Sequence, residues 1–236
     1  MCCPDPPAAT AITIRADIAE TGMDGTGERP GYHIAKNRLE TLADGIFAIA
    51  MTLLVLTITI DKPAPEEARA VLPGILWGLL PQIFTLTIAF IVLAVFWQVH
   101  NRQFHFVRAV DPVHIWITIF MLVAIVLVPF STDISGDYPD VGVAALLFNL
   151  NVFTAGLMIA LQWWYICKNP LLSSPLPEPR VRRIWSWEVA LIPAVALVAV
   201  FLSFVTPVGS LLLYLFAPFV WILLHRYPPS VPALRT

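Results

Sequence analysis

The feature that most constrains this chain is a series of six apolar stretches, each close to the length that a bilayer demands. A helix that crosses the hydrocarbon core needs about 20 apolar residues at a rise of about 1.5 Å per residue. The stretches span residues 42–60, 71–99, 113–130, 141–167, 189–205 and 208–224. The sequence therefore predicts an all-α integral membrane protein with six transmembrane helices.

The charge content of the chain supports this class. Only 13 % of the residues are charged, whereas a soluble domain carries about a quarter. Hydrophobic residues make up 58 % and the mean hydropathy is +0.78. So few charges cannot cover a water-facing surface, and lipid must be the main solvent. The net charge of −2 and the lack of a basic block argue against nucleic acid as a partner.

Composition also divides the chain into three parts. Residues 1–31 are rich in Pro, Gly, Thr and charge, and we interpret them as a mobile cytoplasmic tail. Residues 32–226 hold the six apolar stretches and form the membrane domain. Residues 227–236 form a second short cytoplasmic tail.

Prolines and aspartates mark several helix ends. Pro73 and Pro81 predict that the long second stretch starts at the interface or contains a kink. Asp111, followed by a proline, predicts a capped start of the third helix, and Asp140 can cap the fourth. Pro207 divides the fifth stretch from the sixth.

The distribution of cations gives the topology. If the chain alternates through six spans, 12 of the 14 Lys and Arg residues fall on one side, and only Lys62 and Arg69 fall on the other. Cytoplasmic loops carry such an excess, so both termini are expected in the cytoplasm and the protein in the inner or plasma membrane. Four tryptophans fall near this cytoplasmic interface, as an aromatic belt would: Trp163, Trp164, Trp185 and Trp187.

The first span has one aliphatic face and one carboxylate that points elsewhere. At 100° per residue, one face of the helix collects Leu42, Gly45, Ile49, Leu53, Leu56 and Ile60, with Thr52 on its edge. Asp44 lies about 140° from Ile49 on the same wheel. Such an ionisable group should face protein or water and find a partner. The aliphatic stripe alone is typical of a surface that meets lipid or a neighbouring helix.

The segment around this carboxylate resembles a family motif. The first-helix signature of the transmembrane protein 175 family, potassium channels of lysosomes with bacterial single-repeat relatives, is Arg, three residues, then Phe-Ser-Asp-Gly and an Ala-Ile-Ala-x-Thr-Leu-Leu run. Arg38, Asp44, Gly45 and the run that follows match it. Leu42 and Ala43 replace the Phe and Ser.

The resemblance continues to about residue 168. Residues 97–104, Trp-Gln-Val-His-Asn-Arg-Gln-Phe, resemble the Trp-x-x-His-His-Arg-x-Phe end of the family's second helix. Residues 129–138 are similar to its Pro-Phe-x-Thr…Gly-Glu-Tyr segment. Asn149 and the aromatic cluster 163–165 fit its fourth helix. Beyond residue 168 only hydropathy agrees.

The resemblance implies a potassium-permeable cation channel without a cofactor. Chains of that family assemble as homotetramers around their first helices, and aliphatic rings narrow the path of monovalent cations. By position, the rings here are Ile49, Leu53 and Leu56, with Thr52 as a candidate pore hydroxyl. A packed aliphatic ring closes a pore by excluding water. For Thr52 the alternative is a hydrogen bond to the carbonyl of Ala48.

Four polar residues gather near the cytoplasmic ends of the first two spans. Arg38, Asp44, His100 and Asn101 are expected to form a structural network that holds the pore helix. The alternative is ordinary interfacial charge, with Arg38 extended toward lipid headgroups.

Other functional classes have less support. The sequence lacks His-Glu-x-x-His, Gly-x-Ser-x-Gly, a phosphate loop and paired intramembrane carboxylates, so we do not expect an enzyme. A secondary transporter places polar sites near the midplane between related halves, a pattern that is missing here. A non-conducting membrane scaffold remains an open alternative because of the departures at Leu42 and Ala43.

Overall fold

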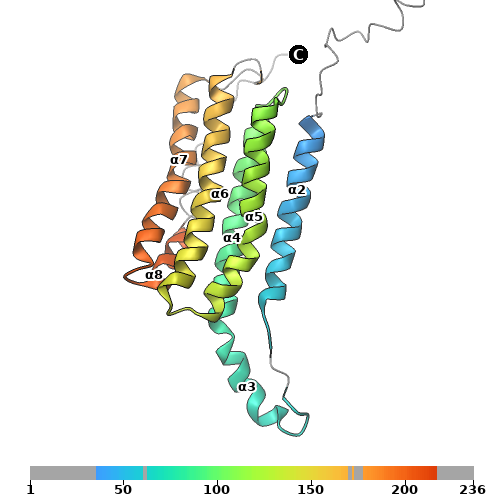
Figure 1. The fold of residues 1–236 in the computed structure, drawn as a ribbon, viewed down its shortest axis with the longest axis vertical. Coiled ribbons are helices and arrows are strands. Elements are labelled where there is room, and N and C mark those ends of the chain that lie inside the picture. Colours follow the sequence, from blue (N-terminus) through green and yellow to red (C-terminus); the bar gives the residue numbers. More distant parts are fainter. Residues whose placement is uncertain (1–35, 61–62, 170–171, 173–177, 217–236) are drawn as a thin grey trace, which may run out of the picture. The chain divides into compact units, whose positions relative to one another are not determined.

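The computed structural model of the protein describes residues 36–216, apart from 61–62, 170–171 and 173–177. Every regular element within these ranges is helical (Figure 1). Five helices are long and apolar enough to cross a membrane. The predicted tails, 1–31 and 227–236, lie outside the described residues.

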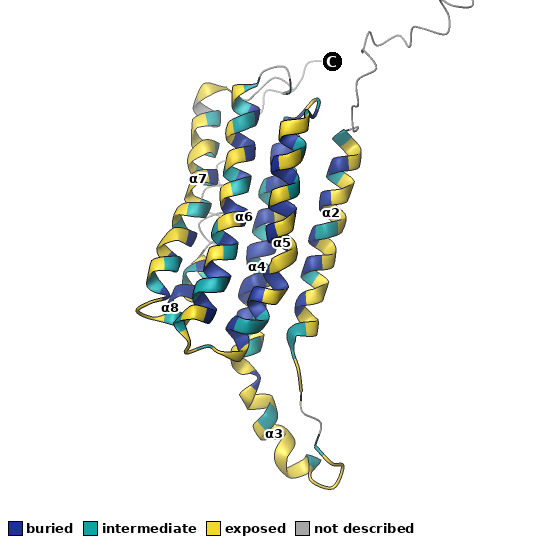
Figure 2. Cartoon of the chain, viewed as in Figure 1, coloured by how far each residue is buried: buried dark blue, intermediate teal, exposed yellow. Residues whose placement is uncertain are grey.

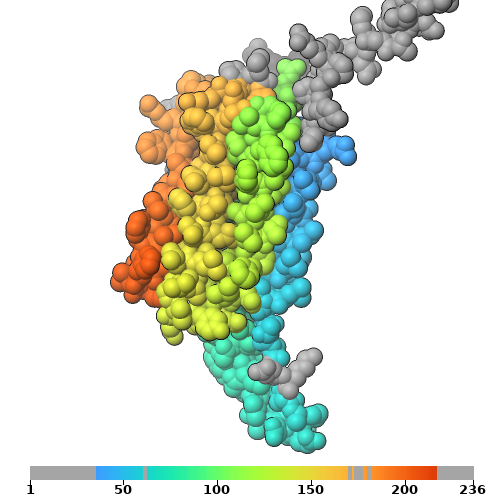
Figure 3. Space-filling view, viewed as in Figure 1, coloured from blue at the N-terminus to red at the C-terminus, as the bar shows by residue number. Residues whose placement is uncertain are grey.

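The first membrane helix consists of two parts. α2 spans Lys36–Leu53, and a 3-10 helix, η1, continues it over Leu54–Thr57. The prediction of one apolar helix over 42–60 was therefore wrong at its end, because Ile58 is already extended. The cause is a run rich in β-branched residues, which disfavour the α-helix. α2 packs on α4 and α5 (defined below) and forms one edge of the bundle (Figures 1 and 3).

The second apolar stretch divides into two helices. α3 spans Ala68–Gly78 and α4 spans Leu80–Phe104, so a break separates them at Leu79. The interruption agrees with the predicted effect of the prolines, since Pro81 stands in the first turn of α4, where a missing N–H costs nothing. α3 buries none of its residues and extends beyond the other helices (Figures 1 and 2).

Three long helices complete the central bundle. They are α5, Pro112–Asp137; α6, Gly142–Lys168; and α7, Pro179–Leu202. Asp111 caps α5 as predicted, because its carboxylate accepts a hydrogen bond from the backbone N–H of His114 at 2.8 Å. The predicted cap at Asp140 was wrong. The residue that caps α6 is Val141, without a side-chain hydrogen bond.

The sixth predicted span is only partly described. α8 covers Pro207–Leu212 and the 3-10 helix η2 covers Leu213–Phe216, which together make a short apolar helix. The rest of the predicted span 208–224 lies outside the described residues. Six spans per chain thus stay a prediction, whereas an all-helical membrane protein is observed.

The core lies where α2, α4, α5 and α6 face one another. Its largest fully buried side chains include Phe47, Ile88, Leu93, Met121 and Phe148. Apolar side chains also cover much of the outer surface (Figure 2). A helix that is apolar on both faces is typical of a membrane protein, since one face meets protein and the other meets lipid.

Neighbouring helices run in alternating directions, which brings the cation-bearing ends together. The start of α2, the end of α4, the end of α6 and the start of α7 all lie at one end of the bundle (Figure 1). Trp163 and Trp185 also lie near this end, with ring centroids 6.0 Å apart. The arrangement is the one that the 12-to-2 cation split requires.

Candidate functional site

α2 has two faces that differ in burial. The face toward the bundle consists of Leu39, Ala43, Phe47, Ala50 and, in η1, Leu54, and each is at most 3 % exposed. On the other side the chain leaves a continuous aliphatic surface uncovered, which includes Leu42 at 50 % exposure. An uncovered apolar face of this kind must meet lipid or another protein surface.

The three predicted ring residues all lie on the uncovered face. Ile49 is 60 % exposed, Leu53 38 % and Leu56 71 %. Leu56 belongs to η1, so an α-helical wheel does not apply to it. In a 3-10 helix, however, side chains three residues apart eclipse one another, and this keeps Leu56 in line with Leu53.

Thr52 is exposed on the same surface. Its hydroxyl donates to the backbone carbonyl of Ile49 at 2.8 Å. This is the kind of bond that the alternative interpretation predicted, but the acceptor is one residue further along than Ala48. Because the hydroxyl proton is used internally, the oxygen lone pairs face outward as the only function that Thr52 offers to an ion.

Asp44 lies at the edge between the two faces and has a partner on the next helix. Its Oδ1 accepts a hydrogen bond from Nε1 of Trp97 on α4 at 2.9 Å. The expectation that this carboxylate needs a partner is met by an indole and not by a cation. The bond joins the pore-side helix to α4 across 53 residues of sequence.

His100 belongs to a separate buried chain of polar groups. Its Nδ1 lies 3.2 Å from Oε1 of Gln162 on α6, and Nε2 of Gln162 donates to Oγ1 of Thr118 on α5 at 2.8 Å. The imidazole also contacts Phe47 of α2, with ring centroids 6.0 Å apart. His100 thus ties α4, α5 and α6 together behind α2.

The other two members of the predicted network have no such contact. Arg38 is exposed and Asn101 half-buried, and neither side chain makes a hydrogen bond or ion pair within the part of one chain that the structure describes. A single network of Arg38, Asp44, His100 and Asn101 is therefore not joined in the isolated chain. In the assembled protein it stays a prediction.

Sequence reasoning missed two residues of this region. Trp97 had been noted in the motif but not as the partner of Asp44, and Gln162 had not been noted at all. The signal for Gln162 was its amide in the middle of an apolar helix, which must be hydrogen-bonded when buried. The described residues contain no cluster of three His, Cys, Asp or Glu side chains that would hold a metal ion.

Comparison with known proteins decides the family. The family model described as endosomal/lysosomal potassium channel TMEM175 matches residues 38–129. A potassium channel of Streptomyces collinus is 30 % identical over 158 residues, which cover 62 % of this chain and 73 % of that channel. The chain belongs to the TMEM175 family. The match of the TMEM175 model covers α2, α3 and α4 and extends to Pro129 of α5, which includes every residue of the candidate site.

Two further relatives place this TMEM175 chain within the family. The endosomal/lysosomal proton channel TMEM175 of Rattus norvegicus is 25 % identical over 211 residues, which cover 84 % of this chain and only 42 % of the rat protein. The crystal structure of a Chamaesiphon minutus homologue of a lysosomal potassium-selective channel superposes with a TM-score of 0.70 at 25 % identity. It covers 80 % of this chain and 98 % of that one. The neighbours are ion channels, and the fold agrees with theirs.

Proposed function

We propose that this protein is a potassium-permeable cation channel, in which four copies surround an ion path lined by α2. The observation that carries the proposal is the uncovered aliphatic face of α2, beside a fully buried opposite face. Ile49, Leu53 and Leu56 would then form successive rings that constrict the path. Such rings gate by excluding water, so the same surface that looks lipid-facing in one chain becomes the constriction in four.

The similarity values favour potassium over protons as the main permeant ion. The Streptomyces collinus relative is called a potassium channel and is 30 % identical, whereas the rat relative is called a proton channel and is 25 % identical. The chain also covers far more of the bacterial protein. Monovalent cations are the proposed cargo and no cofactor is required.

The proposal includes six spans with both termini in the cytoplasm of a cell with an inner or plasma membrane. It is supported by the cation-bearing helix ends, which lie together at one end of the bundle (Figure 1). A secondary transporter has less support, because the middle of α2 offers only aliphatic side chains and Thr52 to a substrate.

Flux from proteoliposomes tests the proposal. Ile49→Asn should wet the constriction and increase leak or reduce the preference of potassium over sodium, in an oligomer that still elutes as the native one. Val198→Asn is the matched control, since Val198 on α7 is 57 % exposed but lies far from α2 in the chain's packing. Equal changes in both variants would contradict a pore at α2, and proton flux measured in parallel shows which ion dominates.

A further inference from the structure

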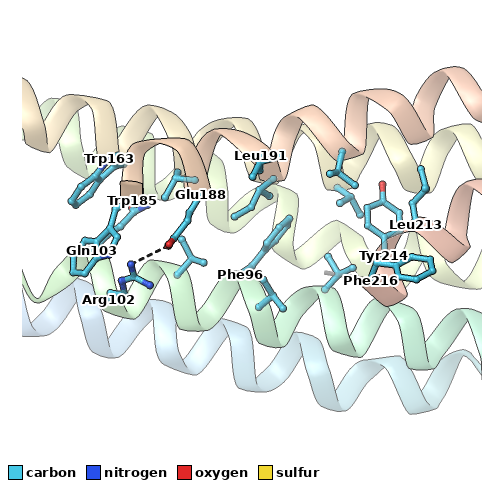
Figure 4. A pocket seen from close by; sticks show the side chains of 17 residues that line it. Phe96, Arg102, Gln103, Trp163, Trp185, Glu188, Leu191, Leu213, Tyr214 and Phe216 are labelled. Atoms are coloured by element: carbon cyan, nitrogen blue, oxygen red, sulfur yellow. Dashed lines mark hydrogen bonds and ion pairs between the residues drawn. The ribbon is translucent and has the colours of Figure 1, made fainter. Parts of the chain in front are cut away.

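A cavity of about 190 Å³ lies between α4 and α7, away from the uncovered face of α2. Its walls are apolar and include Val92, Val95, Phe96, Leu191, Ile192 and Val195. Figure 4 shows that polar side chains gather at one end, while Leu213, Tyr214 and Phe216 lie at the other. Empty space of this size deprives its lining of dispersion contacts, so an apolar chain would be held there.

The polar end of the cavity combines opposite charges with indole rings. Arg102 of α4 forms an ion pair with Glu188 of α7 at 3.1 Å, and its guanidinium lies 3.8 Å from the ring centre of Trp185. Trp163 also lines this end (Figure 4). Tryptophan and arginine at a helix end are typical of the headgroup level of a membrane. The opening therefore lies where a lipid headgroup would be.

Gln103 adds a hydrogen-bond acceptor at the same end. The residue is 3 % exposed, and its Nε2 donates to the carbonyl of Ile159 at 3.2 Å. Since a carbonyl only accepts, this bond fixes which side of the amide carries the oxygen. Oε1 has no hydrogen-bond partner among the described residues. A buried acceptor in this state calls for an N–H or O–H donor from a ligand.

We propose that this cavity binds a zwitterionic phospholipid whose headgroup amine carries N–H donors, as in phosphatidylethanolamine. The ammonium donates to Oε1 of Gln103 and faces Glu188, the phosphate faces Arg102, and the first part of an acyl chain fills the apolar space. A choline headgroup has the same charges but no N–H, so it leaves Gln103 without a donor. The site is separate from the proposed ion path and does not depend on it.

Fluorescence quenching tests this site in the full-length protein. The protein is placed in nanodiscs of phosphatidylcholine that contain a small fraction of phosphatidylethanolamine or phosphatidylcholine, brominated on the acyl chains close to the glycerol. Bromine in the cavity quenches Trp163 and Trp185. One hydrogen bond predicts that phosphatidylethanolamine half-saturates the quenching at about a fivefold lower fraction.

Two variants serve as a matched pair. Gln103→Leu should abolish the difference between the two lipids while quenching at high fractions persists. Tyr214→Phe removes the other buried, unpartnered polar atom that lines the cavity, but at the opposite end, and should keep the fivefold difference. Soluble glycerophosphoethanolamine should not displace the brominated lipid, because a headgroup without its chain leaves the apolar space empty.

Three results would overturn the proposal. The first is equal quenching by both lipids in the unchanged protein, and the second is a preference that survives Gln103→Leu. The third is absence of saturable quenching, which would mean that the protein's own residues beyond Phe216 or another molecule fills the cavity. Potassium flux is a separate measurement, so failure here leaves the proposed channel function unaffected.

Discussion

Phe47 and Ile49 stand two residues apart on α2 and face opposite ways. Phe47 is 1 % exposed, packs in the core and lies with its ring centroid 6.0 Å from that of His100. Ile49 is 60 % exposed on the uncovered face. Truncation of each to alanine therefore separates the stability of the subunit from the properties of the ion path.

The magnitudes follow from burial. Phe47→Ala removes a fully buried aromatic ring, which costs about 3–5 kcal/mol of unfolding free energy. At about 2–4 °C per kcal/mol for a chain of this size, the melting temperature should fall by roughly 6–20 °C. Ile49→Ala empties no core space and should lower the melting temperature by no more than a few degrees, but it widens the constriction and raises the flux.

The assay combines fluorescence-detected size exclusion after heating with potassium flux from proteoliposomes, each normalised to intact oligomer. Phe47→Ala should lose flux in proportion to the oligomer lost, with selectivity unchanged. Ile49→Ala should change flux per oligomer. If the two variants destabilise equally, or if Phe47→Ala alters selectivity in an oligomer of native stability, the assignment of the two faces of α2 is wrong.

Three further predictions concern other parts of the chain. Trp97→Phe removes the donor to Asp44 and should destabilise the subunit by about 1.5–3 kcal/mol, as expected for a hydrogen bond to a charged group, whereas Trp116→Phe on the exposed side of α5 should have little effect; equal shifts in melting temperature would contradict this. Asp140→Cys, in a cysteine-free background, should react with an impermeant thiol reagent on intact cells, and reaction only after lysis would invert the topology; Ser135, in the segment expected to be an external loop, is unsuitable because it is buried in α5. Neutralising Asp133, Asp137 and Asp140 together should reduce cation current more at low ionic strength than at high, because surface charge attracts cations only within the Debye length; equal loss at both would exclude that cause.

Hydropathy predicted the long helices well and their ends less well. α5 and α6 begin within one residue of their predicted starts, because an aspartate and a proline precede one and a short polar loop precedes the other. The change from α2 to η1 could not be predicted from apolar content, since both conformations bury the same residue types. The break at Leu79 followed from a rule of backbone chemistry, the missing N–H of proline, and for that reason it was predicted.

The candidate site was predictable in its periodicity but not in its partners. A wheel places Ile49 and Leu53 on one side of a helix whatever surrounds it. The bond between Asp44 and Trp97 depends on how α2 meets α4, and the chain of His100, Gln162 and Thr118 depends on three helices at once. Such pairings are tertiary, and no local pattern encodes them.

The passage from α2 into η1 sets how far an ion travels without water in the proposed tetramer. Four residues of α-helix separate Ile49 from Leu53 by about 6 Å, and three residues of 3-10 helix separate Leu53 from Leu56 by about the same distance. The three rings would then enclose a dry sleeve about 12 Å long. An ion stripped of water in hydrocarbon costs tens of kcal/mol, so no current passes until the rings part enough to admit its hydration shell. Opening and ion selection would accordingly act on the same three side chains, at the point where the helix is wound most tightly.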